Sequence, residues 1–212
     1  MQPQRLREEH RHLPPRQRRE GLAHAMLEEP EEALQAFRSA LPVFERHELW
    51  SNYVGALNNA ATLLTGLGRF EEARRDYARA LRRLSREHHR YWLGYLRIGF
   101  AEALFAAGRF SEAAAAASRA EGVFQDAGLR AHQLIALLLE VESWARHGSL
   151  DRARSRLEIF WKEIARDGAL DPSVRQELAD ALSGANPDYQ AISSLRRQID
   201  GMLKQRYGSV PA

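Results

Sequence analysis

Several side chains of the metal-ligating type lie near the start of the chain. Glu20, His24 and Glu28 are four residues apart, a spacing that places them on one face of a helix. A protein metal site needs three or four converging ligands, together with further groups that orient them. The sequence supplies no such set around these residues or around its close histidine pairs, which are His10 and His12, and His88 and His89. We therefore expect these side chains to be solvated or to cap helices, and we expect no bound metal.

The sequence also lacks the motifs that enzymes use for nucleophilic and phosphate chemistry. Cysteine is absent, which removes disulfides, thiol nucleophiles and thiolate metal ligands together. No glycine-rich loop follows a strand-like segment, and no Gly-x-Ser-x-Gly motif is present. The sequence therefore predicts a protein that is not an enzyme and has no cofactor. The absence of cysteine is also compatible with a reducing cytoplasm, which we take as the expected location.

The charge of the chain is mildly positive, with a formal net charge of +3 at pH 7. Basic residues clearly exceed acidic ones only in the stretch 5–19, and acidic residues are interleaved nearly everywhere else. Guanidinium groups suit phosphate recognition, so this stretch leaves open a nucleic-acid-associated regulator, which the interleaved acidic residues do not favour. Its arginines are Arg5, Arg7, Arg11, Arg16, Arg18 and Arg19. No segment approaches the roughly 20 apolar residues that span a bilayer, so we expect no membrane insertion.

An internal repeat organises most of the chain. Short segments that begin with an acidic residue or serine and continue into a helix-like pattern recur with a constant step of 40 residues. Their anchoring alanines are Ala33, Ala73, Ala113 and Ala153. Near-identical turns, Gly68-Arg69-Phe70 and Gly108-Arg109-Phe110, precede two of these copies. A register held over four copies predicts a repeat protein.

Each repeat is expected to form two helices. In the second repeat, apolar residues recur at helical spacing from about Trp50 to Leu67, and again from about Glu71 to Arg86. Gly66 and Gly68 lie where the first helix must stop and the chain reverse. Small alanines allow the two helix backbones to approach closely. One hairpin cannot bury both apolar stripes alone, so the sequence predicts hairpins that stack on one another.

The segment 59–73, followed by Tyr77 and by Ala80-Leu81, resembles the signature turn and second helix of the tetratricopeptide repeat family. The resemblance covers about Pro14–Asp167 and is strongest in the second and third repeats. The usual period of this family is about 34 residues, so the 40-residue units resemble the long-helix repeats of kinesin light chains and bacterial peptide-pheromone receptors. The resemblance implies an all-α, right-handed α-solenoid of about four repeats with C-terminal capping helices.

The fourth repeat departs from the family pattern. Ala117 and Leu157 replace the aromatic residue of the second helix in the third and fourth repeats, and Phe160 replaces a small alanine in the fourth. These changes indicate a terminal, degenerate unit. The expected organisation is a flexible basic tail at residues 1–13, four repeats, and C-terminal helices at 168–212. The repeats are placed at about 14–46, 47–86, 87–126 and 127–167.

Two pairs, Asp171-Pro172 and Asn186-Pro187, mark helix starts in the C-terminal region, because Asp and Asn cap helices and proline fits the first turn. They predict helices at Pro172–Ser183 and Pro187–Arg206. The last helix would carry one apolar face, made by Ile192, Leu195, Ile199 and Met202. This face is expected to cap the solenoid; a homodimer contact and insertion into the chain's own groove are the alternatives.

The resemblance also implies where a partner binds, because first helices of successive repeats line the concave surface of such arrays. It assigns to that surface Arg18, Leu22, Asn58, Thr62, Tyr95, Ile98, Glu102, Ile135, Leu138 and Glu142. This set would make a groove with apolar walls and two carboxylates, suited to an amphipathic helix or an extended apolar peptide with a basic group. Asn58 is the strongest single candidate, because its amide can hold a peptide backbone by both donor and acceptor.

The sequence thus predicts a non-enzymatic adaptor or receptor that binds a protein or peptide in its groove. Two alternatives remain open at this stage. One is the nucleic-acid-associated regulator that would use the arginine-rich N-terminus. The other is an oligomeric scaffold that would assemble through the last helix.

Overall fold

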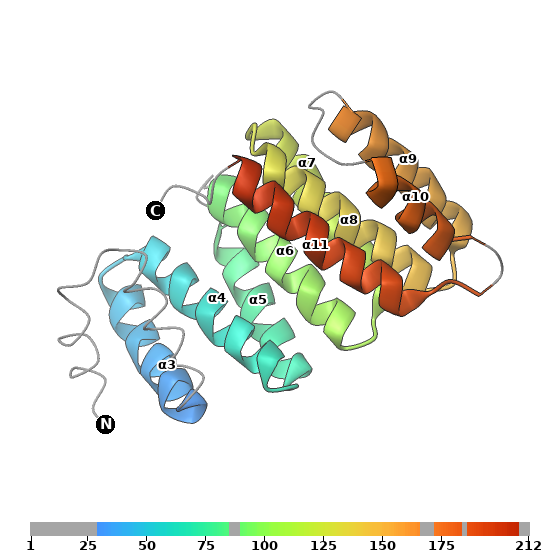
Figure 1. Cartoon of the computed structure of the whole chain (residues 1–212). Coiled ribbons are helices and arrows are strands. Elements are labelled where there is room, and N and C mark those ends of the chain that lie inside the picture. Colours follow the sequence, from blue (N-terminus) through green and yellow to red (C-terminus); the bar gives the residue numbers. More distant parts are fainter. Residues whose placement is uncertain (1–28, 85–89, 166–171, 184–185, 208–212) are drawn as a thin grey trace. The chain divides into compact units, whose positions relative to one another are not determined.

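The computed structural model describes residues 29–84, 90–165, 172–183 and 186–207. Every regular element in these ranges is an α-helix, which confirms the all-α prediction (Figure 1). The helices are α3 (Pro30–Arg46), α4 (Trp50–Gly66), α5 (Phe70–Leu84), α6 (Arg90–Ala106), α7 (Phe110–Asp126), α8 (Arg130–Arg146), α9 (Leu150–Ala165), α10 (Pro172–Ala181) and α11 (Tyr189–Tyr207). The basic tail at 1–13 and the candidates Arg18 and Leu22 lie outside the described residues.

The helices from α3 to α9 begin at 20-residue intervals, half of the step seen in the sequence. Five of the turns between them place one residue in the left-handed region: Glu48 (φ 55°), Gly68 (72°), Gly108 (74°), Gly128 (68°) and Gly148 (82°). In each turn the next amide donates a hydrogen bond of 2.8–2.9 Å to the carbonyl five residues earlier, as in the Schellman motif. The same turn therefore ends both helices of a hairpin.

Glu48 is the only residue other than glycine with a positive φ in the described ranges. A left-handed conformation costs an L-residue about 1 kcal/mol relative to glycine, and the Glu48 side chain is exposed. We expect Glu48→Gly to raise the free energy of unfolding by about 1 kcal/mol, measured as a higher urea midpoint by circular dichroism. Gly68→Ala, in the equivalent turn, should lower it by a similar amount. A loss in Glu48→Gly would show that the turn does not strain Glu48.

The helices belong to two compact units, with α3–α5 within residues 1–87 and α6–α11 within residues 88–211. In the first unit, α4 packs between α3 and α5. Ala60, Ala73 and Ala80 are at most 1% exposed where the helices approach each other. Tyr77, which is 2% exposed, fills the adjacent space. The predicted close approach of the helices at small alanines is confirmed here.

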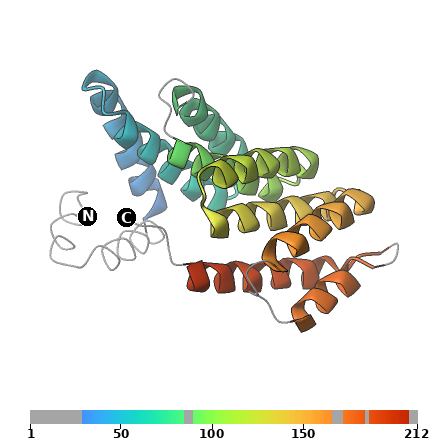
Figure 2. The ribbon, with the colours of Figure 1, turned by 90° about the horizontal axis from the view of Figure 1, so that it is seen from above.

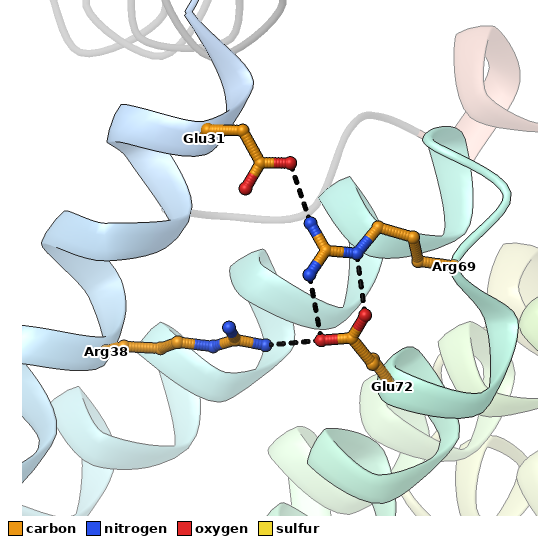
Figure 3. Close-up of polar contacts among 4 residues, drawn as sticks. All are labelled: Glu31, Arg38, Arg69 and Glu72. Atoms are coloured by element: carbon orange, nitrogen blue, oxygen red, sulfur yellow. Dashed lines mark hydrogen bonds and ion pairs between the residues drawn. The ribbon is translucent and has the colours of Figure 1, made fainter.

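Arg69, from the turn before α5, joins α3 to α5 by ion pairs (Figure 3). Its guanidinium donates to Glu31 at 2.7 Å and to both carboxylate oxygens of Glu72 at 2.7 and 2.9 Å. Arg38 of α3 donates to the same Glu72 carboxylate at 3.0 Å. The hydrogen bonds from Arg69, and then those from Arg38, lower the pKa of Glu72 to about 2.

A carboxyl group whose pKa is lower in the folded state stabilises the fold above its unfolded pKa, and this contribution is lost as the pH falls towards the folded pKa. For Glu72 the window runs from the ordinary value of 4.5 down to about 2. We expect Glu72→Gln to make the melting temperature less dependent on pH in this window. Glu32→Gln, which changes an exposed carboxyl group of α3, is the matched control. Identical pH profiles for wild type and Glu72→Gln would contradict the role given to this ion-pair cluster.

In the second unit, α6, α7, α8 and α9 pack as consecutive hairpins. The contact face of α7 consists largely of alanines that are at most 1% exposed, among them Ala113, Ala117 and Ala120. Beyond them, α8 and α9 form one apolar cluster with α10 and α11. Both views show α11 (red) alongside α8 (yellow), and residue contacts between the two helices agree (Figures 1 and 2).

Of the two predicted starts of the C-terminal helices, the first is confirmed and the second is wrong. Helix α10 begins at Pro172, as expected, but ends at Ala181 rather than at Ser183. Helix α11 begins at Tyr189 rather than Pro187, so the second start is wrong by two residues. The reason is that Asp188 acts as the N-cap: its Oδ1 accepts hydrogen bonds from the amides of Gln190 and Ala191, at 3.0 and 2.9 Å.

Candidate functional site

The candidate partner-binding residues in the described ranges lie on α4, α6 and α8, the first helices of the hairpins. We call this set the first-helix face; it consists of Asn58, Thr62, Tyr95, Ile98, Glu102, Ile135, Leu138 and Glu142. The members belong to different units, α4 to the first and α6 and α8 to the second.

On α4, Asn58 and Thr62 lie one helical turn apart. The Thr62 hydroxyl donates to the carbonyl oxygen of Asn58 at 2.9 Å and lies 3.1 Å from the Tyr77 hydroxyl oxygen. Thr62 is exposed and Asn58 is half-buried. The Asn58 side-chain amide makes no hydrogen bond to any residue in the described ranges. Its donor and acceptor are therefore free to bind a peptide backbone.

On α6, the three candidate residues differ in their burial and in the contacts that their side chains make within the second unit. The Tyr95 hydroxyl oxygen lies 2.5 Å from Nε2 of His132, and its ring meets the Phe124 ring edge-on at a centroid distance of 5.6 Å. Ile98 is half-buried against the cores of α6–α8. Glu102 is exposed. Tyr95 thus contributes to packing as well as to the surface, whereas Glu102 faces solvent.

On α8, the candidate residues are buried. Ile135, Leu138 and Glu142 are 8%, 2% and 1% exposed. The apolar pair belongs to the cluster that α8 forms with α9, α10 and α11. The Glu142 carboxylate accepts hydrogen bonds from the Ser193 hydroxyl and from Nε of Arg196, both on α11. These residues are therefore not open to a partner while α11 lies on α8.

The polar contacts between α8 and α11 fix the direction of the pair. Arg146, at the C-terminal end of α8, donates to the Tyr189 carbonyl oxygen at 3.4 Å and to the Ser193 hydroxyl at 3.1 Å. Glu142, one turn earlier in α8, meets Ser193 and Arg196, which come later in α11. The two helices therefore run antiparallel.

The apolar face predicted for the last helix is used inside this unit. Ile192, Leu195 and Ile199 are 1%, 6% and 0% exposed, in the cluster with α8. Met202 is only half-buried, and Leu203, at 1% exposed, takes its place as the fourth buried residue. The spacing from Ile199 to Leu203 is as helical as that to Met202, so spacing alone could not choose between them. While α11 lies on α8, this face is not available to a second copy of the chain.

Sequence reasoning missed the polar residues of this contact, Arg146, Tyr189 and Ser193. Arg146 lies over the Tyr189 ring, 4.9 Å from its centroid. The only sequence signal for these residues is a possible ion pair between a carboxylate on α8 and an arginine of the last helix. This signal could be used only if the antiparallel register of the two helices were already known.

A second group of charges, of which Glu140 is buried and the others half-buried, lies between α7, α8 and α9. Arg156 of α9 pairs with Glu140 of α8 at 2.8 Å and with Glu121 of α7 at 3.3 Å. Burial raises the pKa of Glu140, against the opposing effect of Arg156. Trp144 donates to the same carboxylate at 3.3 Å. These ion pairs join the three helices.

Two other kinds of site are absent from the described residues, a metal site and a membrane-spanning helix. No group of three or more histidine, aspartate and glutamate side chains in them could hold a metal ion. None of the helices in the described part of the chain is long and apolar enough to cross a bilayer.

Comparison with known proteins supports the repeat assignment. Residues 53–126 match the sequence profile of the tetratricopeptide repeat, which confirms the predicted resemblance in the second and third hairpins. Among solved structures, the chain is similar to a crystal structure of a Rap protein complexed with Competence and Sporulation Factor. The TM-score is 0.61, with 15% sequence identity over 82% of this chain and 49% of the Rap chain. The chain thus spans about half the length of that protein, and the likeness concerns the fold. No curated protein sequence matches the chain.

Proposed function

Because this chain carries tetratricopeptide repeats, at residues 53–126, we propose that it is a non-catalytic adaptor or receptor that binds a peptide segment of another protein on its first-helix face. The segment is an amphipathic helix or an apolar peptide with a basic group. The proposal includes action in a reducing cytoplasm, with which the absence of cysteine is compatible.

One observation carries the proposal: the α8 part of the first-helix face binds a helix of this kind in the chain itself. Helix α11 lays an apolar stripe on α8 and pairs a basic group, Arg196, with the buried carboxylate of Glu142. This contact has the chemistry expected of the partner, with apolar anchors at helical spacing and one cation. The Rap protein of the similar structure is complexed with Competence and Sporulation Factor, which supports binding of a partner by this fold.

Two neighbouring asparagines on α4 allow the proposed partner binding to be tested with a matched control. Asn58 and Asn59 are both half-buried, and they point to different faces because they are consecutive in a helix. We expect Asn58→Ala to reduce, by about tenfold, the recovery of the partner captured by immobilised full-length chain from native lysate, since two hydrogen bonds to a peptide backbone are lost. Asn59→Ala should retain the partner. Equal recovery by both variants would remove α4 from the binding face.

A further inference from the structure

Helix α11 presents a compact recognition pattern to α8. Its buried apolar residues are Ile192, Leu195, Ile199 and Leu203. Two polar residues accompany them. Ser193 follows the first apolar residue directly, and Arg196 lies four positions after it. Both side chains donate hydrogen bonds to Glu142. The pattern occupies three turns of one helix.

We propose that the α8 face beneath α11 is a docking surface for an amphipathic helix of a partner protein, and that α11 is a resident occupant which the partner helix replaces. The proposal rests on the proposed function and names its ligand chemistry. The partner helix carries apolar residues at positions i, i+3, i+7 and i+11, a basic residue at i+4 and a small hydroxyl residue at i+1.

The buried charge of Glu142 makes the α8 face selective. A carboxylate that is 1% exposed is strongly destabilising without a partner, because burial removes its water. An apolar helix without a cation would leave Glu142 unpaired, so only a helix with a basic residue at i+4 can replace α11. A partner that supplies the apolar stripe, the hydroxyl and the cation restores the apolar contacts with α8 and the two hydrogen bonds to Glu142.

Helix α11 itself is a weak helix, which suits an occupant that exchanges. Gly201 lies in its interior, and Ser193 and Ser194 follow each other near its start. Glycine and serine both lower helix propensity. A methyl group added at Gly201 would meet no atom within 4 Å, so packing does not require glycine there. Without tertiary contacts, a helix of this composition is only marginally stable in water.

Two substitutions in the full-length chain are expected to shift the equilibrium between docked and displaced α11 in opposite directions. Arg196→Glu places a carboxylate against Glu142 and loosens α11. Gly201→Ala strengthens the α11 helix without a new contact and should shift the equilibrium about threefold to fivefold towards the docked state. Arg197→Glu makes the same charge change on an exposed position of the same helix and is the control.

Fluorescence anisotropy with a labelled synthetic peptide of residues 186–207 measures access to the α8 face. We expect Arg196→Glu to bind this peptide at least tenfold more tightly than wild type or Arg197→Glu, because the peptide still offers Arg196 to Glu142. Gly201→Ala should bind it about threefold to fivefold more weakly than wild type. Equal affinities in all four chains would show that α11 is a permanent cap and overturn the proposal.

Hydrogen exchange of the wild-type chain tests the same claim when Arg196→Glu fails to fold. An exchangeable α11 opens locally, so its amides exchange faster than those of α8, and Gly201→Ala slows them about threefold to fivefold. If the α11 and α8 amides exchange together through one global opening, α11 is not exchangeable. This measurement needs no partner, so its outcome is separate from that of the Asn58→Ala capture.

Discussion

Replacement of Phe160 by alanine is expected to lower the free energy of unfolding of the second unit by about 3–5 kcal/mol. Phe160 is 0% exposed in the cluster of α8, α9, α10 and α11, and its ring meets Trp161 edge-on at 4.9 Å between centroids. Removal of the ring leaves a cavity among four helices. The position corresponds to Ala120 one repeat earlier and to Ala80 two repeats earlier, both also 0% exposed.

Guanidinium unfolding followed by tryptophan fluorescence measures this loss. In a Trp50→Phe background the remaining tryptophans, Trp92, Trp144 and Trp161, all lie in the second unit. Ile159→Ala is the control, since Ile159 is 36% exposed and its truncation should change the free energy by no more than about 0.5 kcal/mol. If Phe160→Ala were as mild as this control, the fourth hairpin would not depend on the aromatic core described here.

A second large effect is expected at Gly94 in α6, where a valine should lower the free energy of unfolding by about 2–3 kcal/mol. An added Cβ would lie 2.5 Å from Cε1 of Phe124 on α7. Phe124 is 1% exposed, and the rings of Tyr95 and His132 lie 5.6 and 5.2 Å from its ring, so it cannot swing away freely. Glycine is therefore required here by the close approach of α6 and α7.

A double-mutant cycle separates this clash from general helix effects. Phe124→Leu should be destabilising alone but should recover part of the loss in Gly94→Val, with a coupling above about 0.5 kcal/mol. Gly122→Ala, in the neighbouring helix, is the control: an added methyl group meets nothing within 4 Å, so the variant should gain about 0.5–1 kcal/mol. If Gly94→Val lost nothing, or if Phe124→Leu gave no recovery, the packing of α6 on α7 would differ from this description.

The repeat and its hairpins could be predicted from sequence because they depend on local signals. The recurring alanines and the Gly68 and Gly108 turns sit at fixed intervals, and the matched residues 53–126 contain the clearest copies. The shorter interval of 20 residues was harder to see, because Glu48 occupies the position at which four later turns have glycine, at 68, 108, 128 and 148. Backbone geometry, not residue type, reveals that equivalence.

The position of α11 on α8 could not be predicted from the sequence. The family resemblance assigned Leu138 and Glu142 to the partner-binding surface, and helical spacing gave the last helix an apolar stripe. It could not show that the stripe lies on that face, because a contact between residues 142 and 196 depends on the path of the chain between them. Ile135 is buried in the apolar cluster that α8 forms with α9, α10 and α11.

The most direct test of partner binding on the first-helix face is photo-cross-linking of the full-length chain inside the cells that make it. A photoreactive phenylalanine analogue at position 62 or 102 lies on a first helix, whereas at position 75 or 119 it lies on a second helix; all four positions are exposed. We predict that a partner protein is cross-linked from 62 and 102 and not from 75 and 119. Cross-links that arise equally from both sets, or only from the second helices, would contradict binding on this face.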